Sequence, residues 1–275
     1  MLIDAHMHLW SLARGDYGWL TPDLPVLYRD FDVGAYRAST RTLPLAGAIL
    51  VQAAASDAET EWLLDLAARH DEIIGVIGWF DPASPGTTSR LVDRKARGMV
   101  GVRPMLQDWP DAWSLLAPQY ADGLAMIDDA GLTFDALVRP HQLSVVAALA
   151  DRHPKLTIIL DHGGKPSIAE GNWTPWAEAI EILGEFPNVR CKLSGLVTEA
   201  RDGADADDLR RYVTHLARCF GGDRLLWGSD WPLVTMRCSL AEWLATARFL
   251  AAELELDDQR LFGANARDAY RLETA

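Results

Sequence analysis

Two histidines near the N-terminus have the spacing of a metal or substrate site. His6 and His8 lie within Asp4-Ala-His-Met-His, at the end of an apolar run that begins at Leu2. Side chains alternate between the two faces of a strand, so both imidazoles point the same way and can share one ion or one substrate oxygen. The alternative is that both are polar residues hydrogen-bonded at a strand end.

Two further apolar runs end in residues that bind metals or move protons. Leu160-Asp-His-Gly-Gly164 contributes His162, and Gly228-Ser-Asp-Trp-Pro232 contributes Asp230. With His6 and His8 they form a set that suits zinc or a similar divalent ion, with one position left open for water. These four residues are therefore candidate metal ligands and catalytic groups. Asp230 would exchange a proton with water as a general base and acid, or would instead cap a following helix.

Basic and aromatic residues at the same strand ends are predicted substrate contacts: Arg103, Lys165, Lys192, Trp79 and Trp231. Cationic groups in an acidic protein would attract an oxygen-rich or anionic substrate and stabilise a developing oxyanion. Ordinary ion pairing is the alternative, and Lys192 with Asp161 is the simplest structural pair. The tryptophans would form pocket walls, unless they are packed in the core.

Apolar runs and helical periodicity alternate along the whole chain. Strands are predicted at 2–6, 46–52, 73–79, 99–103, 132–138, 156–161, 189–193 and 225–229, and helices at 56–70, 88–97, 120–130, 141–153, 175–186, 205–220 and 240–254. This pattern predicts the α/β class and a distorted (β/α)8 TIM barrel, in which chemistry sits at the carboxyl ends of the strands. A doubly wound open sheet is the alternative, but the sequence has no Gly-x-Gly-x-x-Gly turn.

Other local patterns give further expectations. Ser56 and Glu59 have capping-box spacing at the start of one helix. Residues 11–45 lack clear periodicity and are expected to form a long loop that shapes a pocket. His70, His153 and His215 are expected to be solvated on helix surfaces, because charged residues surround them.

Composition narrows the class of protein. A chain of 275 residues with 49% hydrophobic content fits one domain over 1–275. The net charge of −13, without a Lys/Arg run, argues against nucleic acid as a partner. No apolar run reaches the roughly 18 residues of a membrane span. Three cysteines without CxxC spacing, and no signal-like start, favour free thiols and a cytoplasmic location.

Taken together, these motifs resemble the amidohydrolase superfamily. The resemblance rests on Asp4-Ala-His-Met-His-Leu-Trp10, Gly75-Val-Ile-Gly-Trp79, Leu160-Asp-His-Gly-Gly-Lys-Pro166, Cys191-Lys-Leu-Ser-Gly-Leu196 and Gly228-Ser-Asp-Trp-Pro232, with Val51-Gln52, Gly101-Val-Arg103 and Gly263-Ala-Asn-Ala266 in support. It points to the amidohydrolase-related branch, which includes sugar lactonases of the fuconolactonase and rhamnonolactonase kind and pyrone dicarboxylate lactonase.

The resemblance implies water attack on a cyclic ester. By it, Asp230 would activate water and protonate the leaving alkoxide, while His6, His8 and His162 would bind metal or polarise the carbonyl and Arg103 would hold substrate oxygens. One divalent ion, Zn2+, is the expected cofactor, although some lactonases of this branch need no metal. The partner would be a small lactone, and the chain could form a homo-oligomer.

Two departures from the family pattern bear on substrate and metal. Strand 132–138 has no Lys to bridge two metal ions, so at most one tightly held ion is expected. Pro104 follows Arg103, where related sugar lactonases often carry His, and Pro offers no side-chain hydrogen bond. Two other functions are open alternatives: a metal-dependent decarboxylase of an unsaturated or aromatic acid, and a barrel that binds without catalysis.

Overall fold

Eight parallel strands form one sheet in chain order. The computed structural model describes residues 2–83 and 87–272. The strands are β1 (Leu2–Met7), β2 (Leu45–Val51), β3 (Ile73–Gly78), β4 (Met99–Val102), β5 (Thr133–Ala136), β6 (Ile158–Leu160), β7 (Val189–Leu193) and β8 (Leu225–Trp227). All eight predicted strands are present, with small differences at their ends, and the predicted TIM barrel is confirmed.

The barrel closes just beyond the end of β8. Asp230 N donates to His6 O at 2.8 Å, and His8 N donates to Trp231 O at 2.7 Å. The absence of a side chain at Gly228 permits this approach, because a Cβ there would lie 2.7 Å from the His6 Cβ. Closure therefore brings the ends of β1 and β8 together.

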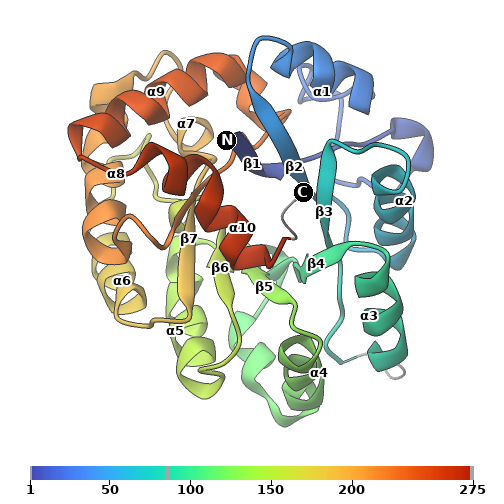
Figure 1. The fold of residues 1–275 in the computed structure, drawn as a ribbon. Coiled ribbons are helices and arrows are strands. Elements are labelled where there is room, and N and C mark those ends of the chain that lie inside the picture. The colour runs from blue at the N-terminus through green and yellow to red at the C-terminus, as the bar shows by residue number, and fades with distance from the viewer. Residues whose placement is uncertain (1, 84–86, 273–275) are drawn as a thin grey trace.

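Helices surround the strands, and α10 lies across one end of the barrel (Figure 1). The helices are α1 (Val33–Thr40), α2 (Asp57–Ala67), α3 (Thr87–Ala96), α4 (Pro118–Asp129), α5 (Leu143–Arg152), α6 (Thr174–Gly184), α7 (Leu196–Glu199), α8 (Ala206–Phe220), α9 (Leu240–Glu253) and α10 (Asn265–Tyr270). The seven predicted helices correspond to α2 to α6, α8 and α9.

The expectation that 11–45 forms only a loop is wrong, since this stretch contains α1. The Asp32 carboxylate accepts a hydrogen bond from Ala35 N, which starts the helix, and Val33 and Tyr36 are buried. A helix this short offers too few turns for its periodicity to be recognised in the sequence.

Two other local expectations need correction. The Ser56 side chain accepts from Glu59 N at 3.0 Å as predicted. The Glu59 carboxylate, however, turns away from Ser56 and accepts hydrogen bonds from Ala53 N and Ala54 N. His215 is 6% exposed rather than solvated, because it lies on the side of α8 that packs against α6 and contacts the Ala177 carbonyl.

Apolar side chains fill the barrel and the space between barrel and helices. A small cluster inside the barrel includes Ile3, Ile49 and Leu226, together with Tyr270 from α10. A larger cluster lies between the strands and the helices. The strand ends are thus held by packing on both faces. Among residues 2–83 and 87–272, no helix combines the length and hydropathy of a membrane span.

Candidate active site

His6 and His8 converge at the carboxyl end of β1. Their Nε2 atoms lie 3.1 Å apart, as the strand alternation predicted. The His8 Nδ1 lies 2.8 Å from the Val51 carbonyl oxygen, which can only accept a hydrogen bond. The His8 Nδ1 therefore carries the hydrogen, and its Nε2 is free to act as an electron-pair donor.

Asp230 faces this pair from beyond the end of β8. Its Oδ1 lies 3.5 Å from His8 Nε2 and 3.8 Å from His6 Nε2. It is buried and, among the described residues, accepts no hydrogen bond. The backbone of Asp230 has a φ of 54°, a left-handed conformation that is uncommon outside glycine and is typical of functional sites.

His162 approaches from the end of β6 and also has a left-handed backbone, with φ 53°. Its Nδ1 lies 3.0 Å from the Ser194 Oγ and 4.0 Å from the Asp230 Oδ2. A Cβ at Gly195 would lie 2.6 Å from this Nδ1, so only glycine leaves room for the ring there. The turn after β7 thus positions the imidazole.

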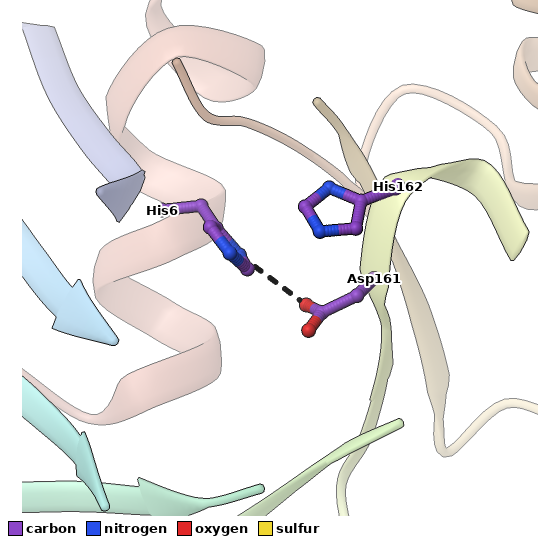
Figure 2. Close-up of side chains that lie close together, drawn as sticks. All are labelled: His6, Asp161 and His162. Atoms are coloured by element: carbon purple, nitrogen blue, oxygen red, sulfur yellow. Dashed lines mark ion pairs between the residues drawn. The ribbon is translucent and has the colours of Figure 1, made fainter. Parts of the chain in front are cut away.

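Arg103 and Asp161 lie beside His6. The guanidinium NH1 of Arg103 donates to Asp161 Oδ2 at 3.1 Å and lies 3.4 Å from His6 Nε2, and its other amino group donates to the Gln52 carbonyl. Asp161 Oδ1 lies 3.4 Å from His6 Nδ1. Figure 2 shows the His6 ring directed at this carboxylate, with His162 nearby.

These groups open onto a cavity of about 330 Å³ at the carboxyl ends of the strands. Five predicted site residues line it: His8, Arg103, His162, Lys165 and Asp230. His6 does not line the cavity; it is fully buried and contacts the lining residues His8 and Asp230. Lys165 is half-buried at the edge and donates to Gln107 Oε1 at 3.0 Å. The structure therefore brings the three histidines and Asp230 together.

Three predicted substrate contacts lie elsewhere, which corrects their placement. Trp79 lines a separate small cleft with Asp57 and Arg94. Trp231 is 3% exposed and packs edge-on against Phe31, because its ring turns outward from the barrel. Lys192 is fully buried beneath the site, where its ammonium is held by carboxylates rather than presented to the cavity.

Other cavity residues were not identified from the sequence as substrate contacts: Trp19, Ala53, Met105, Gln107, Asp108, Leu137 and Leu233. Trp19 is the largest, and its indole N–H donates to the Ala53 carbonyl at 2.8 Å. It comes from the long segment after β1, so its place on the wall depends on tertiary packing alone. Arg139 also lines the cavity, and the sequence marks it by the same feature as Arg103 and Lys165, a basic residue at the end of a strand.

Burial shapes the protonation of the site. It lowers the pKa of His6 and His8, and it lowers the pKa of His162 to about 4, so all three rings are neutral at pH 7. Burial alone would raise the pKa of Asp230, but at the low pH where this carboxyl titrates the facing imidazoles are protonated, and their positive charge, led by His162, holds that pKa below its usual range. Asp230 is therefore an ionised carboxylate among neutral imidazoles.

The donor set of His6, His8 and Asp230 fits a divalent cation. Neutral His8 Nε2 and ionised Asp230 Oδ1 are both electron-pair donors, yet they face each other at 3.5 Å. A cation between them would remove this repulsion. The separations of 3.1 to 3.8 Å within the set suit ligands that share one ion at the roughly 2.0–2.2 Å bond lengths of zinc. His162 belongs to a second set, with His6 and Asp161.

Comparisons with known proteins agree with this geometry. An L-fucono-1,5-lactonase from Burkholderia ambifaria is 36% identical over 98% of this chain and 96% of its own length, and one from Burkholderia multivorans is 35% identical. A crystal structure of an amidohydrolase from Burkholderia multivorans with bound zinc superposes with a TM-score of 0.93 at 33% identity, covering 99% of this chain and all of that one. The amidohydrolase family model matches residues 3–272, and the chain therefore belongs to the amidohydrolase family.

Proposed function

We propose that this protein hydrolyses the cyclic ester of a sugar 1,5-lactone. The observation that carries the proposal is the Oδ1 of Asp230, which is buried, ionised and without a hydrogen bond from any described residue, in a cavity that also presents Arg103 and His162. The two curated L-fucono-1,5-lactonases support this class of substrate.

The reaction needs a base that later becomes an acid. The Asp230 carboxylate takes a proton from water as the water oxygen bonds to the lactone carbonyl carbon. When the bond between that carbon and the ring oxygen breaks, Asp230 returns the proton to the leaving alkoxide. The product is a hydroxy acid, which ionises at neutral pH and releases one proton per turnover.

The other side chains stabilise charge and position the substrate. Arg103 places a guanidinium beside His6, where it would offset the negative charge that develops on the carbonyl oxygen. Neutral His162 would hold a substrate oxygen by hydrogen bonding. Trp19 and Leu137 give the cavity apolar walls for the carbon skeleton of a sugar ring.

A zinc ion is the proposed cofactor, held by His6 Nε2, His8 Nε2 and Asp230. Such an ion supplies Lewis acidity toward a carbonyl oxygen. The zinc-bound amidohydrolase of 33% identity supports this assignment.

A pH-indicator assay tests both parts. Metal-stripped and zinc-loaded protein would be mixed with a panel of sugar 1,5-lactones and 1,4-lactones, with the spontaneous hydrolysis of each lactone subtracted. Acid release from at least one 1,5-lactone is expected. If neither preparation speeds any lactone beyond its spontaneous rate, the proposed function is wrong. Equal rates in the two preparations would show that zinc is dispensable for the reaction.

A further inference from the structure

Lys192 is a fully buried cation directly beneath the proposed metal ligands. Its Nζ lies 2.6 Å from Asp135 Oδ2, 3.0 Å from Asp161 Oδ1 and 3.1 Å from His6 Nδ1. Two carboxylates would suffice to neutralise it, so charge balance alone does not explain the contact with the His6 ring. The ammonium of lysine can only donate hydrogen bonds.

Two alternative sets of partners surround the His6 ring, one for each neutral tautomer. If Nδ1 accepts from Lys192, then Nε2 carries the hydrogen and donates to His8 Nε2 at 3.1 Å. If Nδ1 carries the hydrogen, it faces Asp161 Oδ1 at 3.4 Å, and Nε2 can accept from Arg103 NH1 at 3.4 Å. The shorter pair of contacts belongs to the first tautomer.

Only the second tautomer can bind a metal ion through Nε2, because a protonated ring nitrogen has no free electron pair. It also needs a hydrogen-bond acceptor at Nδ1. Asp161 Oδ1 is buried, and within the described part of the chain the Lys192 ammonium at 3.0 Å is the donor beside it; a carboxylate oxygen has two lone pairs, so it has the capacity to accept from Nδ1 as well.

We propose that Lys192 and Asp161 select the tautomer of His6: Lys192 stabilises the Nε2–H ring, which cannot bind zinc, and Asp161 stabilises the Nδ1–H ring, which can. As zinc binds, Nε2 gives its proton to solvent and Nδ1 takes one from solvent, so the ring stays neutral. Asp161 and Lys192 are thus positioning residues for the metal. This inference rests on the proposed zinc site and does not depend on which substrate is hydrolysed.

The 15N resonances of the histidine side chain report the tautomer directly. Protein labelled with 15N-histidine would be compared before and after zinc is added to metal-stripped samples, and the His6 signals would be assigned by their loss in His6→Gln. Protonated Nε2 is expected without zinc, and protonated Nδ1 with zinc. A ring that already carries its hydrogen on Nδ1 without zinc, or a His6 ring that zinc does not change, would overturn the inference.

Two variants test whether Asp161 acts by positioning His6 or only by balancing the charge of Lys192. Each removes one negative charge beside Lys192. Asp161→Asn should weaken zinc binding about 10- to 100-fold, because the acceptor for Nδ1–H loses its charge. Asp135→Asn removes the other carboxylate of Lys192 and should change zinc affinity by less than about threefold, since no contact joins it to His6. Calorimetric zinc titration measures both, and equal losses in the two variants would count against the inference.

These readouts are independent of catalysis. Protein that shows the tautomer change but opens no lactone would contradict the proposed function alone. Protein that opens lactones with an unchanged His6 tautomer would contradict this inference alone. The wild-type 15N measurement needs no substitution, so it still decides the question if either variant fails to fold.

Discussion

At the scale of single residues, the site combines ionised Asp230 with neutral imidazoles. Buried carboxylates usually become harder to ionise, but His162, His8 and His6 surround this one and hold its pKa below its usual range. Burial keeps those rings neutral, so they can donate electron pairs or hydrogen bonds at pH 7. Each group thus has the protonation state that the proposed hydrolysis requires.

Replacing Asp230 with Asn removes the group that is proposed to exchange a proton with water. The turnover number kcat is expected to fall about 10²- to 10⁴-fold in the lactone assay, because an amide cannot accept that proton. Asp108→Asn is the matched control, since this carboxylate also lines the cavity but has no contact with the histidines. A similar loss in both variants would mean that cavity charge, rather than proton transfer, explains the effect.

At the scale of elements, the turns after the strands position the groups proposed to be catalytic. His162 and Asp230 both follow short strands and adopt left-handed backbone conformations, and both line the cavity. The turn after β7 supports His162 through Ser194, and Gly195 leaves space for the ring. The loop after β2 is fixed by Glu59 of α2, whose carboxylate accepts hydrogen bonds from Ala53 N and Ala54 N.

The close approach of Gly195 to His162 gives a test of positioning. Gly195→Ala should lower kcat/KM by at least about tenfold, because the new Cβ would lie 2.6 Å from the ring and displace it. Gly203→Ala is the control: its φ of 73° resembles the 65° of Gly195, but no heavy atom lies within 4 Å of its Cβ. Gly203→Ala should lose about 1–2 kcal/mol of stability in urea unfolding and Gly195→Ala at least as much, and only Gly195→Ala should lose activity. Equal activity in the two variants would contradict the role of Gly195 in positioning His162.

Glu59 should make stability depend on pH. Burial raises its pKa from 4.5 to about 7, so the folded protein holds this proton more tightly than the unfolded chain does. The free energy of unfolding that Glu59 contributes is therefore greatest below pH 4.5 and falls by about 3 kcal/mol as the pH rises to 7 and above. Urea unfolding of wild type and Glu59→Gln between pH 4.5 and 8 measures this pH dependence of the free energy of unfolding. If the two proteins show the same dependence on pH, this contribution of Glu59 is excluded.

At the scale of the whole molecule, the two ends of the barrel have different roles. The carboxyl end holds the cavity, whereas α10 covers the opposite end (Figure 1). Tyr270 of α10 belongs to the apolar cluster inside the barrel. Its hydroxyl donates to Asp135 Oδ2 at 2.8 Å, and Asp135 in turn binds Lys192. Helix α10 is thus connected to the buried ion pairs of Lys192 with Asp135 and Asp161, as well as to the apolar core.

Tyr270→Phe should therefore destabilise the whole barrel. Loss of the hydroxyl leaves one acceptor site of a buried carboxylate without its donor, which is expected to lower the free energy of unfolding by about 1–3 kcal/mol. Tyr28→Phe, at a position that is 42% exposed, should change it by less than about 0.5 kcal/mol. Urea denaturation, monitored by circular dichroism, distinguishes the two variants. If Tyr270→Phe has the free energy of unfolding of the wild type, the hydrogen bond to Asp135 does not contribute to stability.

Strand and helix alternation could be recognised from the sequence because it is a local property. Apolar runs and turn residues within a few positions specify each strand, and the end of each strand specifies which residues reach the carboxyl face. His6, His8, His162 and Asp230 follow from that rule, and the structure brings them together. The short helix α1 was not predicted, because its 8 residues show too few turns for helical periodicity to be recognised.

Which side chains point into the cavity was decided only by the tertiary structure. Lys192 and Trp231 occupy strand ends as Arg103 does, yet one is enclosed by carboxylates and the other packs outward. Trp19 reaches the cavity from a segment with no periodic pattern. Lys192 and Asp135 are 57 residues apart in the chain, and contacts at such separations depend on barrel closure and packing rather than on any local pattern of residue types.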